Sequence, residues 1–520
     1  MKQRKKEDDV LEKSCYIKGK VIAEQCYDGK KVFFAVWDGV DVSYRPSIDD
    51  GIQIKPIWAE EVQKKAIALP EKAQEYGTDE ELDKEIIKFI DKWLDISDDF
   101  KQFCLWNIKR SWVYDRFHTL NYLRALGDTG MGKSRFLDVL GILHYKPIFT
   151  SGAATASPVF RLIEKWKGTL IMDEADFEKS DENQDIIKII NMGYERGKHV
   201  IRSDKDNLDA VNFFDPYCPK ILATRKVFDD KAVESRCITE VMRGTYRDNI
   251  PVNLNDSFFK DAQILRNKLL LWRFKHYWAV EPNKEIDIGV PGLEPRIRQI
   301  VSGFVNLFAD DEKLMDRFRV FIKKHQESII SERQSSWYGE IVGALHELVK
   351  NGQQDISMQD IIDQGQLTNY KGQPLKPRGL VSTIKALGFG SSYVQRIGET
   401  TKRCIPLDKD VMCNIFTRYG YDVTVVTIVT ESRVLQKGEE EDVGGTDHNY
   451  RNNRNNVTQI IPIDQVKTAL ISLLADKKKV PIQEFLDTYP DYETAIKQLL
   501  ENMKRDGEIF EGPAGMLQLL

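Results

Sequence analysis

The sequence predicts an α/β protein in which a parallel sheet is flanked by helices, with a small β-domain before it and helix-rich modules after it. Two observations carry this prediction. Five short apolar runs between residues 120 and 245 are separated by helical segments, a pattern typical of a parallel sheet. Before them, β-prone runs alternate with Asp-Gly turns, and after them apolar residues recur at helical spacing.

Composition limits the class of protein. The 520 residues are enough for about three or four domains. A net charge of -5 argues against a uniformly basic nucleic-acid coat but leaves room for local basic surfaces. Seven cysteines form no CxxC pair, which predicts reduced thiols and no zinc site. With no apolar signal segment and no membrane-length apolar run, we expect a cytoplasmic protein without membrane contact.

The first part of the chain is predicted to be a disordered polar tail over residues 1–12 and a small β-domain over residues 13–65. The turn dipeptides Asp28-Gly29 and Asp38-Gly39 separate three β-prone runs, which indicates a meander of three to five strands. Aromatic side chains of this domain are expected to form its core rather than to stack on nucleobases.

Residues 75–330 are predicted to form the α/β core with helices before and after it. Thr78 and Glu81 have the spacing of a capping box, so a helix begins there, and a second is expected from Asp99 to about Phe117. Residues 255–330 are predicted to be helical. The expected strands of the sheet are Tyr122–Leu126, Pro147–Thr150, Thr169–Met172, Lys220–Ala223 and Cys237–Met242.

A glycine-rich segment after the first of these strands matches the phosphate-binding pattern GxxxxGK[ST]. Its glycines let backbone N–H groups turn inward toward phosphate oxygens, and the following helix directs its positive end at them. Lys133 is expected to contact the β- and γ-phosphates, and the Ser134 hydroxyl to bind Mg²⁺. The segment therefore predicts a site for ATP and Mg²⁺ made by Gly127, Asp128, Thr129, Gly130, Met131, Gly132, Lys133 and Ser134.

A second motif lies about forty residues further on, where an apolar strand ends in Asp173 and Glu174. A buried strand delivers its carboxyl end to the edge of the sheet where the phosphates bind. Asp173 is expected to hold Mg²⁺, and Glu174 to orient or deprotonate the attacking water. The pair favours an ATPase over a kinase or a GTPase.

In these motifs, and in their order, residues 100–330 resemble the AAA+ ATPases. The resemblance places Thr224 at the first sensor position, which is often Asn in that family, so that Arg225 could take the role instead. The segment that ends in Ser235-Arg236 is similar to the one that supplies an arginine finger to a neighbouring subunit. The resemblance thus implies an oligomer, with a hexameric ring as the family expectation.

Two β-prone runs, 199–202 and 210–214, predict a hairpin inserted before the sensor strand. It resembles the pore hairpin of superfamily 3 viral helicases and of minichromosome maintenance helicases. Lys205 at the tip and Arg202 beside it would contact the backbone of single-stranded DNA, although Asp204 and Asp206 offset the charge of Lys205.

The remaining chain is predicted to hold two winged-helix modules, residues 336–425 and 460–520, joined by a flexible linker over residues 431–458. Helix Pro377–Leu387 of the first module would present Arg378 and Lys385 to duplex DNA, among other basic residues clustered in that module. The second module resembles the C-terminal winged helix of the minichromosome maintenance family and could bind either DNA or protein.

Together these features resemble the replication helicases of viruses, plasmids and integrated elements. The resemblance implies an ATP-driven DNA helicase that acts as a ring, with further replication partners. Two alternatives remain open: an AAA+ initiator or loader that remodels DNA without translocation, and a protein-remodelling ATPase. The pore signature of protein remodellers, an aromatic residue followed by Gly, is missing from the sequence TSGAA at residues 150–154.

Overall fold

The protein is described here by a computed structural model. It covers residues 10–426 except 65, 152–153, 177–180, 204–210, 282–286, 309–310, 370 and 398–399; beyond 426 it covers 480–481, 500, 509–512 and 516–519. The chain divides into two compact units, residues 1–437 and 438–520. No helix in the described ranges combines the length and the apolar character that a membrane span needs.

The N-terminal β-domain is an antiparallel meander, as predicted. Both Asp-Gly turns close in the same way: the Asp28 carboxylate accepts from two backbone N–H groups at 2.9 Å, and so does the Asp38 carboxylate. A second small sheet has the order β1-β7-β6, so residues 10–12, expected in the tail, pair with β7. The strands are β1 (Val10–Glu12), β2 (Cys15–Lys18), β3 (Val21–Tyr27), β4 (Val32–Trp37), β5 (Val42–Arg45), β6 (Ile48–Asp49) and β7 (Gln53–Lys55).

Short helix α1 (Glu60–Gln63) is followed by two longer helices before the sheet, α2 (Asp79–Trp93) and α3 (Asp98–Trp112). The capping box is present, because Thr78 accepts from the Glu81 N–H while the Glu81 carboxylate accepts from the Thr78 N–H. Helix α3 ends earlier than predicted and is followed by the 3₁₀ turn η1 (Tyr114–Arg116).

The central sheet has five parallel strands in the order β14-β8-β13-β10-β9. This confirms the predicted α/β class, and each expected strand is found within one residue at either end. Strand β13 lies between β8 and β10, so the carboxyl ends of these three strands are neighbours. The bounds are β8 (Tyr122–Leu126), β9 (Ile148–Ser151), β10 (Leu170–Asp173), β13 (Lys220–Thr224) and β14 (Cys237–Val241).

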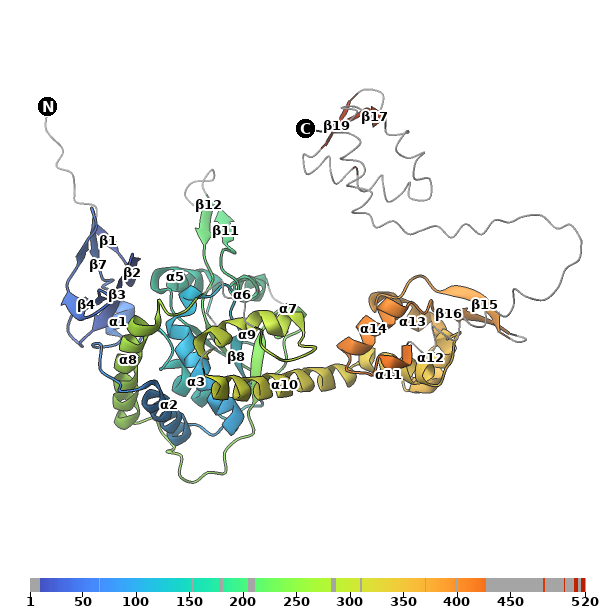
Figure 1. The fold of residues 1–520 in the computed structure, drawn as a ribbon, viewed down its shortest axis with the longest axis horizontal. Helices are drawn as coiled ribbons and strands as arrows, with labels where there is room; N and C mark the ends of the chain where they lie inside the picture. Colours follow the sequence, from blue (N-terminus) through green and yellow to red (C-terminus); the bar gives the residue numbers. More distant parts are fainter. Residues whose placement is uncertain are drawn as a thin grey trace, which may run out of the picture. The chain divides into compact units, whose positions relative to one another are not determined.

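Helices flank this sheet, and the three longer helices α8, α9 and α10 complete the core (Figure 1). The inserted hairpin β11–β12 extends beyond α5 and α6 in the same view. The elements are α4 (Lys133–Gly141), α5 (Ala156–Trp166), α6 (Asp181–Met192), β11 (Val200–Ser203), β12 (Val211–Phe214), α7 (Lys231–Glu234), α8 (Asp256–His276), α9 (Pro295–Phe308) and α10 (Glu312–Gln334).

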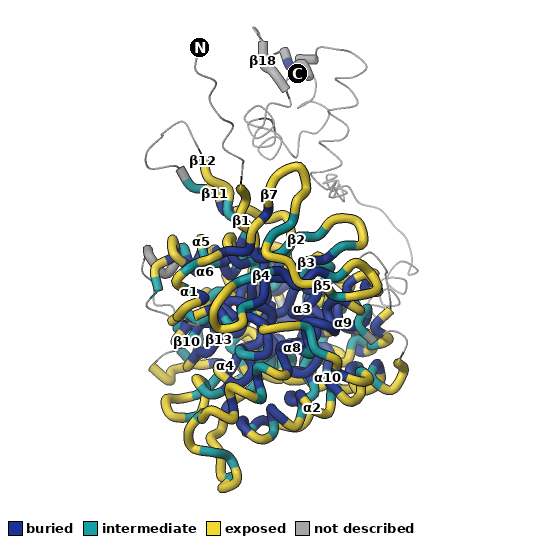
Figure 2. Tube along the Cα trace, turned by 90° about the vertical axis from the view of Figure 1, so that its left-hand side faces the viewer, coloured by how far each residue is buried: buried dark blue, intermediate teal, exposed yellow. Residues whose placement is uncertain are grey.

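A large hydrophobic core runs through part of the β-domain and the α/β region, and the β-domain also has a smaller cluster of its own, made by Ala23, Phe34, Val36 and Ile54. The large core includes Ile22 of β3, Leu123 of β8 and Phe318 of α10, all buried. Figure 2 shows the same continuity as a dark-blue interior beneath β3 and β4 and around α3 and α8. The β-domain therefore packs as part of the α/β core, and the two share one folded body.

A buried ionic cluster joins the same regions. Glu24 of β3 is 1% exposed and pairs with Lys146 at 2.8 Å and with Arg273 of α8 at 2.8 Å. Arg273 also pairs with Asp115 of η1 at 2.8 Å, and the Tyr145 hydroxyl donates to Glu24. Burial raises the pKa of Asp115, but the charge of Arg273 and the hydrogen bonds that the carboxylate accepts together outweigh burial and lower the pKa.

Residues 337–426 have a separate hydrophobic core. They form three helices, a hairpin and one further helix, and the third helix agrees with the predicted helix Pro377–Leu387 to within one residue. The elements are α11 (Trp337–Lys350), α12 (Met358–Gly365), α13 (Pro377–Ala386), β15 (Tyr393–Ile397), β16 (Thr400–Cys404) and α14 (Lys409–Arg418).

In the second unit, the described strands form a sheet in the order β17-β19-β18. They are β17 (Val480–Pro481), β18 (Ile509–Gly512) and β19 (Met516–Leu519). The expected linker and most of the second expected winged-helix module lie outside the described residues.

Candidate functional site

The glycine-rich segment predicted to bind phosphate lies between β8 and α4, where the motif requires it. Gly130 and Gly132 have φ values of 83° and 88°, in the left-handed region that glycine adopts without strain. The Gly127 N–H donates to the Thr224 carbonyl at 3.1 Å, which ties the start of the loop to the end of β13. A Cβ at Gly127 would lie 3.0 Å from the Met242 carbonyl oxygen, so a larger residue would crowd the segment after β14.

The two motifs meet at this edge of the sheet. The Ser134 hydroxyl donates to Asp173 Oδ2 at 2.7 Å, although the residues are 39 positions apart. Lys133 Nζ donates to the carbonyls of Gly127 and Asp128 at 2.8 and 2.7 Å, so the ammonium lies within the loop. Serine hydroxyl, aspartate carboxylate and lysine ammonium are thereby gathered beside the positive end of α4.

The oxygen donors suit a magnesium ion. Mg²⁺ prefers one or two carboxylate or hydroxyl oxygens and keeps several waters. Ser134 and Asp173 supply such oxygens side by side. The residues present therefore fit Mg²⁺, which would be held by Ser134 and Asp173.

Glu174 directly follows β10 in an uncommon backbone conformation. Its φ is 52°, in the left-handed region, which costs a non-glycine residue about 1–3 kcal/mol. Its N–H donates to Asp173 Oδ1 at 2.8 Å, and its side chain is 69% exposed. The backbone thus turns the Glu174 carboxylate away from the sheet and toward solvent.

The two candidate sensor residues at the end of β13 are placed differently. Thr224 is fully buried, and its hydroxyl oxygen is enclosed by protein atoms, away from solvent. Arg225, the next residue, is 51% exposed and lies 3.5 Å from Glu174 Oε1 and 3.5 Å from Asp176 Oδ2. Of the two candidate sensor residues, Arg225 is therefore the one whose side chain lies beside carboxylates, those of Glu174 and Asp176.

Arg236, the expected finger, precedes β14 and is turned toward α6. It is 6% exposed, donates to Asn191 Oδ1 at 2.5 Å and lies over the Tyr194 ring at 4.1 Å. A guanidinium in this position has its partners within its own subunit. Contact with a neighbour's nucleotide would require another side-chain rotamer.

The hairpin has the predicted antiparallel form, with Ile201 opposite Phe213 and Arg202 opposite Asn212. Arg202 faces the body of the protein, where it pairs with Asp185 at 2.8 Å and lies over the Phe160 ring at 4.8 Å. Lys205 lies outside the described residues. The other face of the stem presents Ile201 and Phe213, each 60% exposed.

Helix α13 places its basic residues outward, as predicted for a recognition helix. Arg378 and Lys385 are exposed, whereas Leu380 and Ile384 are buried in the local core. Arg378 and Lys385 therefore lie on the solvent side of α13, and whether they contact DNA stays a prediction.

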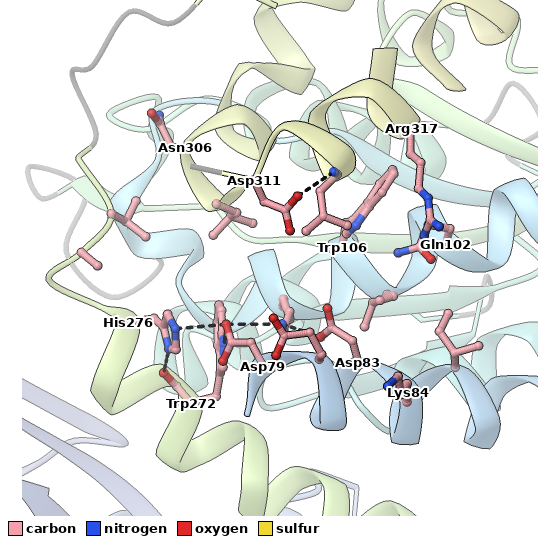
Figure 3. Close-up of a pocket in the computed structure, with 18 of the residues that line it drawn as sticks. Asp79, Asp83, Lys84, Gln102, Trp106, Trp272, His276, Asn306, Asp311 and Arg317 are labelled. Atoms are coloured by element: carbon pink, nitrogen blue, oxygen red, sulfur yellow. Dashed lines mark hydrogen bonds and ion pairs between the residues drawn. The ribbon is translucent and has the colours of Figure 1, made fainter. Parts of the chain in front are cut away.

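A separate cavity of about 820 Å³ lies between α2, α3, α8 and the start of α10 (Figure 3). Trp106, Trp272 and His276 line it, and Asp79 pairs there with His276. None of the predicted nucleotide residues lines this cavity.

Sequence reasoning missed two residues of the site. Asp176 accepts from the Arg225 N–H at 2.7 Å, and Met242 packs against the glycine loop. Neither belongs to a motif, so only the fold identifies them.

No known protein family matches the sequence, and no curated protein matches it. Among solved structures, the apo C-terminal region of NrS-1 is 11% identical, with a TM-score of 0.36 over 74% of this chain and 95% of that one. The structure named SCCmec type IV Cch, described as an active helicase, is 11% identical, with a TM-score of 0.37 over 81% of each chain. Both scores are low, so a function for this chain has to be inferred from its own residues.

Proposed function

We propose that this chain is an ATP hydrolase that acts on DNA as a helicase or translocase. The observation that carries the proposal is the contact between Ser134 and Asp173, which unites the phosphate-binding loop with the acidic strand end. These two motifs together are what phosphoryl transfer to water requires: a cradle for phosphates, a cation site and a base.

Each residue has a defined task in this reaction. Backbone N–H groups of residues 127–134 and the Lys133 ammonium would bind the phosphates. Ser134 and Asp173 would hold Mg²⁺, which when bound would supply positive charge against the phosphates. Glu174, displaced from the sheet by its backbone, orients the attacking water and accepts its proton.

The DNA part of the proposal depends on two surfaces. The inserted hairpin, with Lys205 as its expected contact, would bind single-stranded DNA, and the exposed Arg378 and Lys385 of α13 would contact a duplex. Together with the motif resemblance, these two surfaces support a replication helicase of a mobile or viral element. The helicase would act as a ring in which Arg236 reaches the nucleotide site of the neighbouring subunit.

The position of Arg236 favours a second candidate, an initiator or loader that uses ATP as a switch. With the guanidinium held by Asn191 and Tyr194, hydrolysis would wait for assembly to draw it out. Such a protein would remodel DNA without translocation.

Steady-state ATPase activity with and without single-stranded DNA tests the proposal, with Glu174→Gln as the control for the base. A motor shows strong stimulation by DNA, and Glu174→Gln loses about 10²–10⁴-fold in rate. Slow hydrolysis that rises with protein concentration but not with DNA supports the initiator. No Mg²⁺-dependent hydrolysis under any of these conditions rules out the proposed activity.

A further inference from the structure

The segment that follows strand β14, residues 242–252, lies along the glycine-rich loop. The Met242 side chain lies 3.6 Å from the position of a Cβ at Gly132, and a Cβ at Gly244 would lie 3.5 Å from the Met131 sulfur. The segment therefore borders the loop on the side of β14.

Arg135, the residue after Ser134, gives a second link to this segment. Its guanidinium donates to the Pro251 carbonyl at 2.9 Å and also to the Val252 carbonyl. The start of α4 is thereby joined to the far end of the segment, so that residues 242–252 border the site from the loop to α4.

The order of the strands indicates which end of a bound nucleotide would lie on this side. Strand β8, which leads into the loop, has β14 on one side and β13 on the other, and β10 lies beyond β13. The proposed reaction places Asp173 and Glu174, at the end of β10, beside the terminal phosphate. Because the nucleoside is at the opposite end of the triphosphate, it would extend toward the segment after β14.

Tyr246 lies in this segment between two anchored neighbours. The Thr245 hydroxyl donates to Asp95 at 2.7 Å and accepts from the Arg247 N–H at 3.0 Å, and the Arg247 guanidinium pairs with Asp91 at 3.1 Å. The backbone on both sides of Tyr246 is therefore held to the end of α2 and the residues after it. Tyr246 itself is 97% exposed, so its ring can turn about its side-chain bonds.

An exposed aromatic ring suits a nucleobase. Stacking two flat rings removes apolar area of both from water, and a tyrosine side chain loses little conformational freedom when it stacks. Among the large apolar side chains of the described residues, Tyr246 and Val252 are the most exposed, and both belong to this segment. The side of the site where the nucleoside would lie thus carries the apolar groups with the most surface to cover.

We propose that Tyr246 is the platform on which the base of the bound nucleotide stacks, so that the segment after β14 binds the nucleoside while the glycine-rich loop binds the phosphates. The inference rests on the proposed ATPase function. It makes Tyr246 a residue that contributes to substrate affinity and takes no part in the chemical step.

Two ligands that differ only in the nucleoside test the platform without depending on turnover. Isothermal titration calorimetry would compare Mg²⁺–ADP with Mg²⁺–pyrophosphate. In Tyr246→Ala the affinity for ADP falls about 5- to 150-fold, the loss expected for one stacked base, while the affinity for pyrophosphate stays the same. Because Tyr246 is almost fully exposed, this change removes no core contact and the variant folds as the parent does.

Two further variants serve as controls. Tyr246→Phe keeps the ring without the hydroxyl and binds ADP as tightly as the parent, which separates stacking from a hydrogen bond to the phosphates. Tyr338→Ala makes the same change as Tyr246→Ala at an exposed tyrosine of α11, and it alters neither affinity.

The two levels of the proposal fail in different ways. A parent chain that binds neither ADP nor pyrophosphate refutes the ATP site and the platform with it. A parent that hydrolyses ATP, together with a Tyr246→Ala variant of unchanged affinity for ADP, refutes the platform alone. Equal losses of affinity for ADP and pyrophosphate in Tyr246→Ala also contradict the platform, because they show that the residue acts on the phosphates.

Discussion

Arg236 could have either of two roles: a structural contact within its own chain, or an arginine finger that reaches a neighbouring subunit. Its guanidinium packs on Tyr194 and bonds to Asn191, yet its place before β14 suits a finger that reaches a neighbour. A residue that acts across an interface and the base it serves belong to different subunits. They can therefore complement each other in mixed assemblies.

We predict that Arg236→Ala and Glu174→Gln, each nearly inactive alone, recover activity when mixed. In a mixed ring, some sites combine the intact Glu174 of one variant with the intact Arg236 of the other. The ATPase rate of an equimolar mixture, compared with the mean of the separate variants, measures this. A mixture no faster than the mean would assign Arg236 to its own subunit, where it packs on α6.

At this scale, the sequence predicted the loop and the acidic pair because each motif is contiguous and its residue types follow from chemistry. It could not decide between Thr224 and Arg225, since the end of β13 determines which of two adjacent side chains faces the site. Nor could it place Arg236 beside Asn191, because the contact joins residues 45 positions apart.

Among the elements, helix α2 is joined to helix α8 through the Asp79 carboxylate. Asp79, the first residue of α2, pairs with His276 at 3.2 Å and accepts from the Trp272 indole at 3.3 Å. Burial alone would raise the pKa of Asp79, but the bond from His276 and the nearby charge of Lys109 outweigh it and lower the pKa to about 2.

The depressed pKa of Asp79 predicts a pH dependence of stability. A carboxyl with a lowered folded-state pKa stabilises the fold above its unfolded-state pKa and loses this contribution as the pH falls through the folded-state value. Asp79→Asn should cost about 1 kcal/mol at neutral pH, after allowance for solvent screening at this half-exposed pair. Urea unfolding at pH 7 and at pH 3 would show whether the difference shrinks with acid, as expected, or stays constant.

The hairpin stem offers a test of how Arg202 acts. Its described contacts are with Asp185 and Phe160, so we expect it to hold the stem against α5 and α6 rather than to bind DNA itself. Asp185→Asn should then reduce DNA stimulation of the ATPase as much as Arg202→Ala does. If only Arg202→Ala has an effect, the arginine contacts DNA as the sequence predicted.

For the whole molecule, the prediction from sequence treated residues 13–65 as a separate domain because its β-pattern differs from the helical pattern after it. The spacing of apolar residues predicts local structure, but it does not show which surfaces of distant segments pack together. The shared core and the cluster of Glu24, Lys146 and Arg273 arise from contacts between distant segments. The sequence of either segment alone contains no pattern that predicts these contacts.

We predict that Glu24→Gln lowers the free energy of unfolding of the β-domain and the α/β region, as one body, by about 3–5 kcal/mol. Replacing one member of a buried cluster leaves the charges of its partners uncompensated. Urea unfolding followed by tryptophan fluorescence and by far-UV circular dichroism would measure this as one coincident shift. A shift in one probe only would show that the β-domain unfolds independently.

The buried cluster of Glu24, Lys146 and Arg273 also has a consequence for folding during synthesis on the ribosome. Glu24 and Arg273 are 249 residues apart, so strand β3 is synthesised long before its partner helix. At about 5–20 residues per second, the delay is roughly 10–50 s. During that time the Glu24 carboxylate stays hydrated and the inner face of the meander stays uncovered, which makes the nascent chain a client for chaperones until α8 has emerged.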